Sequence, residues 1–149
     1  MIKIRKAITE DITSIVESQQ KMALETESLK LDPKILKRGV QSVFDDPNKG
    51  FYLVAEIDQT VVACTMLTPE WSDWRNGTFL WIQSVYVEPA YRQKGVYGKM
   101  YSFIKQLVMN SKEYLGLRLY VVMNNKVAQE VYERTGMDGN HYKMFEWVK

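Results

Sequence analysis

The sequence predicts a single α+β (or mixed α/β) domain, and three observations support this class. Strand-like and helix-like segments are interspersed along the 149 residues, without internal repeats, low-complexity runs or linkers. Hydrophobic residues make up 46% and charged residues 26% of the chain, as in globular proteins that bury a core. This length suits one domain spanning residues 1–149 and is short for two.

The bulk composition narrows the classes of function. A net charge of +2 gives no case for a general binder of nucleic acid or of a membrane surface, and we expect neither partner. The apolar runs are too short to span a membrane, and residues 1–5 alternate like a strand instead of forming a signal-peptide core, so we expect a cytoplasmic location. His141 is the single histidine and no metal-ligand spacing surrounds it, so no metal is expected. The single Cys64 lies in a Val-rich strand pattern, which favours a buried inert thiol over a nucleophile.

The N-terminal third is predicted to be one strand followed by two helices. Apolar and basic side chains alternate over residues 2–7, which is typical of a strand with one buried face. Thr9 is the expected N-cap of a helix that runs to about residue 25, and the polar residues 25–30 form a connection. Asp32-Pro33 is a second start signal, because aspartate caps a helix and proline fits its first turn; residues 46–50 end this helix.

The middle of the chain is predicted to form three strands. Residues 51–57 and 61–67 form a hairpin whose turn is Asp58-Gln59. A loop is expected over residues 69–77, and a long strand over residues 79–87.

The C-terminal part is predicted to alternate helices and strands. An amphipathic helix follows a basic loop and starts near Val96. A strand is expected over residues 117–123, and Asn124 or Asn125 caps the next helix, which Gly136 ends. A last strand is expected over residues 142–148, where apolar and polar side chains alternate.

The stretch from Ser84 to Lys99 organises the rest of the chain. It is predicted to be a strand, a turn opened by Pro89, a basic loop containing Gly95, and a helix. Such a loop directs free backbone N–H groups to the positive end of a helix dipole, which is an anion site and most readily a phosphate site. The strands on either side of the helix should be parallel, which places the loop at the carboxyl end of a strand, where open sheets bind ligands. The alternative is an ordinary turn with solvated basic residues.

Two spaced motifs add a family resemblance. The pattern Val85-x-Val87-x-Pro89-x-x-Arg92-x-x-Gly95 precedes the amphipathic helix, and Asn125-x-x-Ala128-x-x-x-Tyr132-x-x-x-Gly136 follows a strand. Their order and spacing resemble the GNAT superfamily of acetyl-CoA-dependent N-acetyltransferases. The resemblance implies a central mixed, mostly antiparallel twisted sheet of six to seven strands flanked by about four helices, with acetyl-CoA as co-substrate.

The resemblance also implies roles for individual residues. Val85 and Val87 would pair through their backbones with the pantetheine arm of coenzyme A. The backbone N–H groups offered to its diphosphate would be those of Arg92, Gln93, Lys94, Gly95, Val96, Tyr97 and Gly98. Asn125 would contact the pantetheine or cap its helix. Without the resemblance, a core aromatic on the apolar face of its helix is the favoured interpretation of Tyr132. With the resemblance, we favour a general acid near the thioester sulfur.

Two departures from the family pattern concern the loop and the general base. Tyr97 stands where the family has a small residue, and Trp81 stands where many members carry a carboxylate. Glu70 and Asp73 are the available acids, in a segment that also contains two tryptophans. These acids and rings can form a pocket for a cationic amine, or the rings can pack on the sheet or on a second subunit. A water chain can also carry the proton to bulk solvent.

Three functions follow, in decreasing order of support. The first is an N-acetyltransferase that moves an acetyl group from acetyl-CoA to a primary amine by direct attack. The second is an acyl-CoA-binding sensor or interaction module without catalysis, and the third is a structural domain without a ligand. The acceptor, a small molecule or a peptide, carries no recognisable motif, and exposed-looking aromatics make a homodimer a further hypothesis.

Overall fold

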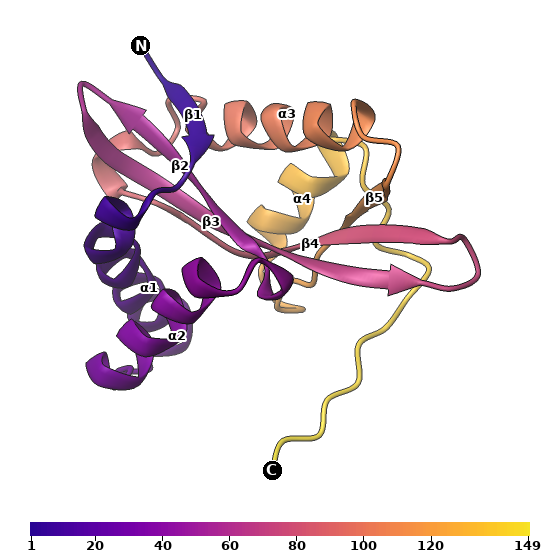
Figure 1. Cartoon of the computed structure of the whole chain (residues 1–149), viewed down its shortest axis with the longest axis horizontal. Coiled ribbons are helices and arrows are strands. Elements are labelled where there is room, and N and C mark those ends of the chain that lie inside the picture. Colours follow the sequence, from indigo (N-terminus) through magenta and orange to yellow (C-terminus); the bar gives the residue numbers. More distant parts are fainter. The chain divides into compact units, whose positions relative to one another are not determined.

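The structure is a computed structural model that describes all residues 1–149, and it divides into two compact units, Met1–Arg118 and Leu119–Lys149 (Figure 1). The elements of the first unit are β1 (Lys3–Lys6), α1 (Ile12–Glu27), α2 (Pro33–Asp45), β2 (Phe51–Ile57), β3 (Thr60–Ser72), β4 (Gly77–Val87), α3 (Val96–Met109) and β5 (Tyr114–Arg118). The second unit contains α4 (Lys126–Arg134). The expectation of a single domain remains a prediction.

The sheet of the first unit confirms the predicted α+β class. Its five strands lie in the order β1-β2-β3-β4-β5. The first three neighbouring pairs are antiparallel, and β4 and β5 are parallel, as expected for two strands joined by the crossover helix α3. The sheet has five strands, so the expected number of six to seven is wrong.

Local sequence signals start and end two of the helices as predicted. The Asp32 carboxylate accepts hydrogen bonds from the backbone N–H groups of Lys34 (2.8 Å) and Ile35 (3.1 Å), and Pro33 follows as the first residue of α2. The Asn125 side chain accepts from Ala128 N–H at 3.2 Å and caps α4. The first four N–H groups of a helix have no partner within the helix and need capping groups of this kind, which is why these signals are visible in the sequence.

The start of α1 differs from the prediction. Residues Thr9–Asp11 form a 3-10 turn, and the capping side chain is Asp11 instead of Thr9. Asp11 accepts from Ile8 N–H at 2.8 Å and from the Arg5 guanidinium at 2.6 Å and 3.0 Å. Arg5 also donates to Glu56 at 2.9 Å, so one guanidinium holds two carboxylates from two elements. The ion pair with Arg5 of β1 therefore holds Asp11 in the capping position that was expected for Thr9.

The buried Asp11 predicts an acid-sensitive stability. Burial alone would raise the pKa of Asp11, but hydrogen bonds from Arg5 and Ile8 outweigh it and hold that pKa below its ordinary value. The ionised group therefore stabilises the fold above its unfolded pKa of about 3.9, and this stabilisation is lost as pH falls through the lower folded value. We expect Asp11→Asn to lower the free energy of unfolding at pH 7 by about 1–3 kcal/mol, since Arg5 loses a buried partner.

Urea unfolding of Asp11→Asn and of the exposed control Glu10→Gln, at pH 7 and below pH 4, measures this contribution. The deficit of Asp11→Asn should shrink at the lower pH, and Glu10→Gln should match the parent protein at both. A deficit of the same size at both pH values would contradict the assignment.

Three predicted segments are wrong. Residues 69–72 extend β3 and residues 77–78 extend β4, so the expected 69–77 loop shrinks to the turn 73–76. Pro69 is tolerated there because β2 pairs with β3 only as far as Leu67, which leaves a single strand neighbour. The strand expected over 117–123 is β5, four residues of which pair with β4 and which ends at Arg118. Residues 142–148 form no strand, because an alternating pattern alone supplies no partner for their backbone groups.

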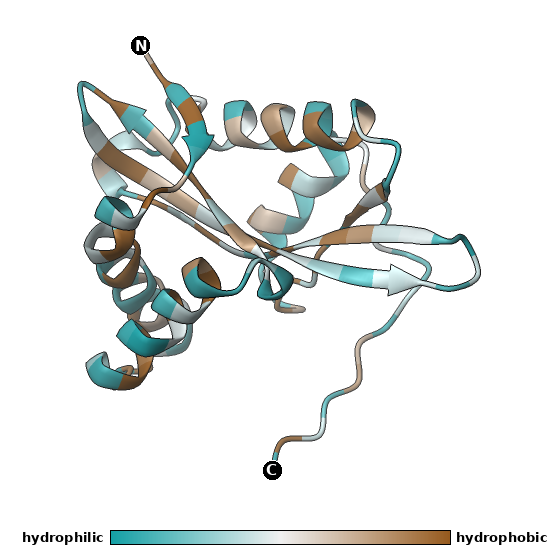
Figure 2. Ribbon diagram, in the orientation of Figure 1, coloured by the Kyte–Doolittle hydropathy of each residue, from teal (hydrophilic) through white to brown (hydrophobic).

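Three helices cover the two faces of the sheet, and hydrophobic residues recur along these helices and along the strands (Figure 2). The core on one face joins α1 and α2 to the sheet, with Ile15, Val40 and Cys64 among its buried members. The core on the other face joins α3 to the sheet through Val96 and Met100. No helix is long and apolar enough to cross a membrane.

Strand β4 contains a bulge at Gln83. Met66 pairs with Ser84 while the next residue, Leu67, pairs with Ile82, so Gln83 has no partner on β3. An extra residue of this kind bends a strand and re-aims its side chains, and such bulges are frequent beside active sites.

Candidate active site

The carboxyl-terminal half of β4 has an open edge within the first unit. Pairing with β5 ends at Trp81 and Arg118, although β4 continues to Val87. The N–H of Glu88 donates to the Val62 carbonyl of β3 at 2.9 Å. Because successive residues of a strand direct their backbone groups to opposite sides, Val85 and Val87 direct theirs away from β3. These two backbones lie at the edge where an extended ligand can add as a strand.

The loop after this edge presents a run of amides. The N–H of Arg92 donates to Pro89 at 3.3 Å, and that of Lys99 donates to Gly95 at 3.1 Å. Between them, no acceptor in the chain receives a hydrogen bond from the N–H groups of Gln93, Lys94, Gly95, Val96 and Gly98. Gln93 (φ 60°) and Gly95 (φ 77°) adopt left-handed conformations, and this sharp path turns the amides to the start of α3. Such a concave run of N–H groups binds anions.

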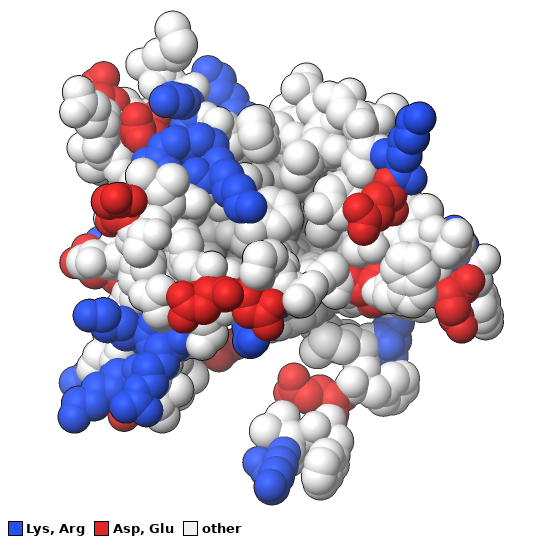
Figure 3. All heavy atoms as spheres, viewed as in Figure 1, with Lys and Arg blue, Asp and Glu red and all other residues white.

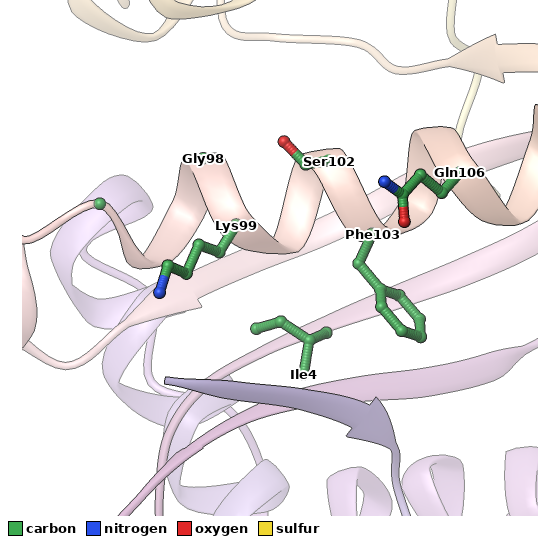
Figure 4. A pocket seen from close by; sticks show the side chains of 7 residues that line it. Ile4, Gly98, Lys99, Ser102, Phe103 and Gln106 are labelled. Atoms are coloured by element: carbon green, nitrogen blue, oxygen red, sulfur yellow. The ribbon is translucent and has the colours of Figure 1, made fainter. Parts of the chain in front are cut away.

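The glycines of this loop leave room for a ligand. A Cβ atom added at Gly95 or at Gly98 would meet no heavy atom within 4 Å. Both glycines border a groove of about 520 Å³ between α3 and β1 (Figure 4). Lys99 and Phe103 extend from α3 on its β1 side and line this groove together with Ile4. The amide loop with its two open glycines therefore fits a diphosphate, which such amides neutralise.

The Arg92 side chain turns away from the amides. Its Nε donates to the Val87 carbonyl at 2.8 Å, and its Nη2 pairs with Glu25 of α1 at 2.7 Å. The guanidinium also lies over the Tyr86 ring, 5.5 Å from its centroid. The hydrogen bond with Glu25 raises the pKa of Arg92 above its ordinary value. Arg92 thus offers its backbone to a ligand while its side chain binds the protein.

Two other side chains of the loop also pack on neighbours. The Lys94 ammonium lies 5.5 Å from the centroid of the Tyr91 ring. The Tyr97 ring packs against Tyr101 one helical turn later, with centroids 6.2 Å apart. On the face drawn in Figure 3, positive and negative side chains are interspersed, with positive ones over β1 and over α1 and α2. The concentration of free amides is therefore the anion-binding feature of the loop.

A row of polar side chains runs along β4 on the face that α1 covers. Gln19 of α1 donates to Ser84 at 3.1 Å, and Gln83 donates to Thr68 at 2.8 Å. Sequence reasoning missed Gln19, Ser84 and Thr68, because only the register of the strands and the bulge brings them together. The alternation of side chains along 79–87 was the available signal, and the bulge shifts it by one residue.

Glu70 and Asp73 lie in different surroundings. Glu70 accepts a hydrogen bond from the Trp81 indole at 2.7 Å and forms an ion pair with Arg118 of β5. Asp73 is exposed in the turn at the hairpin tip, where it accepts from Trp74 N–H at 2.9 Å. The structure therefore places Glu70 on the polar row, beside the position where the family often has its carboxylate, and places Asp73 beyond it. Trp71 and Trp74 are exposed, at 62% and 90%, so neither packs on the sheet.

The second unit holds the other predicted residues. Asn125 caps α4, and Tyr132 lies in the last turn of that helix. Met137 N–H donates to the Tyr132 carbonyl and Gly136 N–H donates to that of Glu133, with Gly136 at φ 89°, a left-handed helix end. Burial raises the pKa of Tyr132 above the ordinary value of a phenol, so its hydroxyl keeps its proton at neutral pH.

Other reactive groups are scarce. Cys64 is fully buried, and burial raises the pKa of its thiol to about 11, which leaves it protonated and confirms an inert thiol. No group of three or more His, Cys, Asp or Glu side chains could hold a metal ion.

The sheet order, the open edge of β4 and the amide loop together define a domain of the kind that binds a diphosphate-linked ligand along a strand. The family model of the acetyltransferase (GNAT) family matches residues 11–137. The chain therefore belongs to the GNAT family, whose members use acetyl-CoA, and it is an acyltransferase. A search of curated proteins finds no match.

Solved structures give the same result. A possible acetyltransferase from Clostridium difficile 630 is 41% identical with a TM-score of 0.94, and the match covers 100% of this chain and 98% of that chain. The aminoglycoside N-acetyltransferase AAC(6')-Iy in complex with coenzyme A is 12% identical with a TM-score of 0.80 and coverages of 100% and 95%. A ribosomal-protein-alanine N-acetyltransferase from Brucella melitensis biovar Abortus 2308 is 11% identical with a TM-score of 0.78 and coverages of 99% and 100%. At these two lower identities the likeness concerns the fold alone.

Proposed function

We propose that the protein transfers the acetyl group of acetyl-CoA to a primary amine by direct attack. The observation that carries this proposal is the run of amides from Gln93 to Gly98, directly after the open edge of β4. The amides bind the diphosphate of coenzyme A, and the backbones of Val85 and Val87 bind the pantetheine arm. Asn125 fixes the start of the helix that carries Tyr132.

The chemical step uses one proton donor of this chain. The neutral amine nitrogen forms a bond to the thioester carbonyl carbon, and the carbon–sulfur bond breaks. Tyr132 gives its hydroxyl proton to the departing thiolate, and the amine releases its extra proton to water. The buried Cys64 is protonated, so we propose no acetyl-enzyme.

The acceptor lies along the polar row beside Glu70 in this proposal. Glu70 forms an ion pair with Arg118 and accepts a hydrogen bond from Trp81, so its carboxylate is held in a fixed place instead of being free to act as a base. We assign it to binding the acceptor, and Asp73 to the outer rim near the two exposed tryptophans.

Incubation with acetyl-CoA and a panel of primary amines, small molecules and peptides, tests the function. Free thiol release and an acetylated product detected by mass spectrometry would support it.

One observation supports a second candidate function, an acyl-CoA sensor. Trp81 stands where a carboxylate is expected and Glu70 is engaged in an ion pair, so no free carboxylate lies on the polar row of β4. Tight acetyl-CoA binding by calorimetry, with no transfer to any amine, would establish the sensor instead.

A further inference from the structure

We infer that Lys21 and Glu25 of α1 are positioning residues for the coenzyme A loop. Lys21 Nζ pairs with Glu88 at 2.6 Å, and Glu25 pairs with Arg92 at 2.7 Å. Glu88 precedes the 3-10 turn Pro89–Tyr91 and Arg92 follows it. Helix α1 therefore holds both ends of this turn. We call the set of these residues the α1 clamp: Lys21, Glu25, Glu88 and Arg92. The inference rests on the proposed function, because it assigns a role within the same coenzyme A site.

The spacing on α1 makes the clamp possible. Lys21 and Glu25 are four residues apart, so both project from the same side of the helix. Their charges are opposite, and so are those of Glu88 and Arg92, which means that the turn fits α1 in only one orientation. The Tyr86 hydroxyl lies 3.5 Å from Glu25, and its ring lies under the Arg92 guanidinium. A side chain of β4 thus supports the clamp.

The clamp acts on the amides through Arg92. Its Nε binds the Val87 carbonyl, the last carbonyl of β4, so the side chain ties the start of the loop to the end of the strand. The next residue, Gln93, takes the left-handed conformation with which the run of amides begins. Fixing Arg92 therefore fixes the direction of the first amides. A loop that already has its bound shape loses less conformational entropy when the diphosphate binds.

The clamp is half-exposed, and this sets the size of the expected effect. The side chains of the two pairs are 27–48% exposed, and pairs of this kind contribute modestly and weaken in salt. We expect removal of both pairs to weaken coenzyme A binding about three- to tenfold at low salt, with little change in kcat. The difference should shrink at high salt, because screening already weakens the pairs in the parent protein.

The test uses a double variant that keeps the net charge. Lys21→Gln with Glu25→Gln removes one positive and one negative charge, so a change in affinity does not come from altered net charge. The matched control is Glu27→Gln with Lys30→Gln, which removes one charge of each sign near the same end of α1, where neither residue forms an ion pair. Lys21→Arg with Glu25→Asp keeps both charges and should restore binding.

Calorimetry with coenzyme A and turnover with acetyl-CoA and with S-acetylpantetheine separate the outcomes. The inference predicts a higher Kd and KM for the diphosphate-containing ligands and unchanged kcat/KM for S-acetylpantetheine, which lacks the diphosphate. Equal affinity in the parent protein and the double variant would overturn the clamp, and so would an equal loss with S-acetylpantetheine. If the parent protein itself binds no coenzyme A, the proposed function fails, and this result is distinct from either of those.

Discussion

Replacing Tyr132 by phenylalanine is expected to lower kcat about 10²- to 10⁴-fold, the usual contribution of a positioned general acid. The KM for acetyl-CoA should change little, because the ring remains and only the hydroxyl is lost. A coenzyme A thiol, with an ordinary pKa of about 8.5, leaves much more readily when a proton is supplied. Burial raises the pKa of Tyr132, so the proton stays on the hydroxyl throughout the neutral range and the group is always ready as an acid.

Single-turnover rates at several pH values provide the measurement, since they report chemistry without product release. Tyr142→Phe makes the same chemical change at an exposed ring of the second unit and should leave the rate unchanged. A Tyr132→Phe variant with the parent single-turnover rate would remove Tyr132 as the acid. The same loss of kcat with a large loss of coenzyme A affinity would identify it as a binding residue instead.

Replacing Gly95 by alanine is expected to weaken coenzyme A binding tenfold or more. Gly95 has φ 77°, and an L-residue pays about 1–2 kcal/mol in that region. In the variant, the backbone at position 95 can avoid this cost only by rotating to negative φ. That rotation turns the neighbouring amides away from the ligand. A change of about 1.4 kcal/mol in the bound state corresponds to tenfold in Kd.

Gly136→Ala is the matched control for this backbone strain. Gly136 has φ 89°, and a Cβ atom added there also meets nothing within 4 Å. Both variants should lose similar thermal stability, but only Gly95→Ala should bind coenzyme A more weakly by calorimetry. Equal affinities in the two variants would show that the amides do not hold the diphosphate.

Much of the fold is visible in the sequence because its signals are local. The Asp32-Pro33 start, the Asn125 cap and the Asp58-Gln59 turn each act within a few residues, and the structure has all three where expected. The prediction of a strand over 142–148 is wrong because a strand needs a neighbouring strand, and no local pattern specifies one. The prediction of Thr9 as the cap of α1 is wrong for a similar reason, since Asp11 is held there by Arg5 of another element.

The candidate site also has a part that local sequence signals predict and a part that they do not. The amide loop follows from glycine positions and a helix start, and these are local. The partner of Arg92 is 67 residues away in the sequence, and Glu70 meets Trp81 only through the register of a hairpin that contains a bulge. Side-chain partners of this kind depend on the assembled sheet, so the sequence indicated a phosphate loop and left the contacts that support it unseen.

The extra residue at Gln83 marks a place where this chain can lose a residue and keep the register of its sheet. Without it, Ile82 and Ser84 would be adjacent and would still oppose Leu67 and Met66, so Ser84 and Tyr86 would stay on the side where α1 packs. The hairpin tip at residues 73–76 is exposed and can also change in length without turning side chains to the other face. A deletion within a regularly paired stretch would instead invert the faces of the residues that follow it. In a library of single-residue deletions, folded members should therefore be recovered from the tip and from Gln83, and lost from the regularly paired stretches.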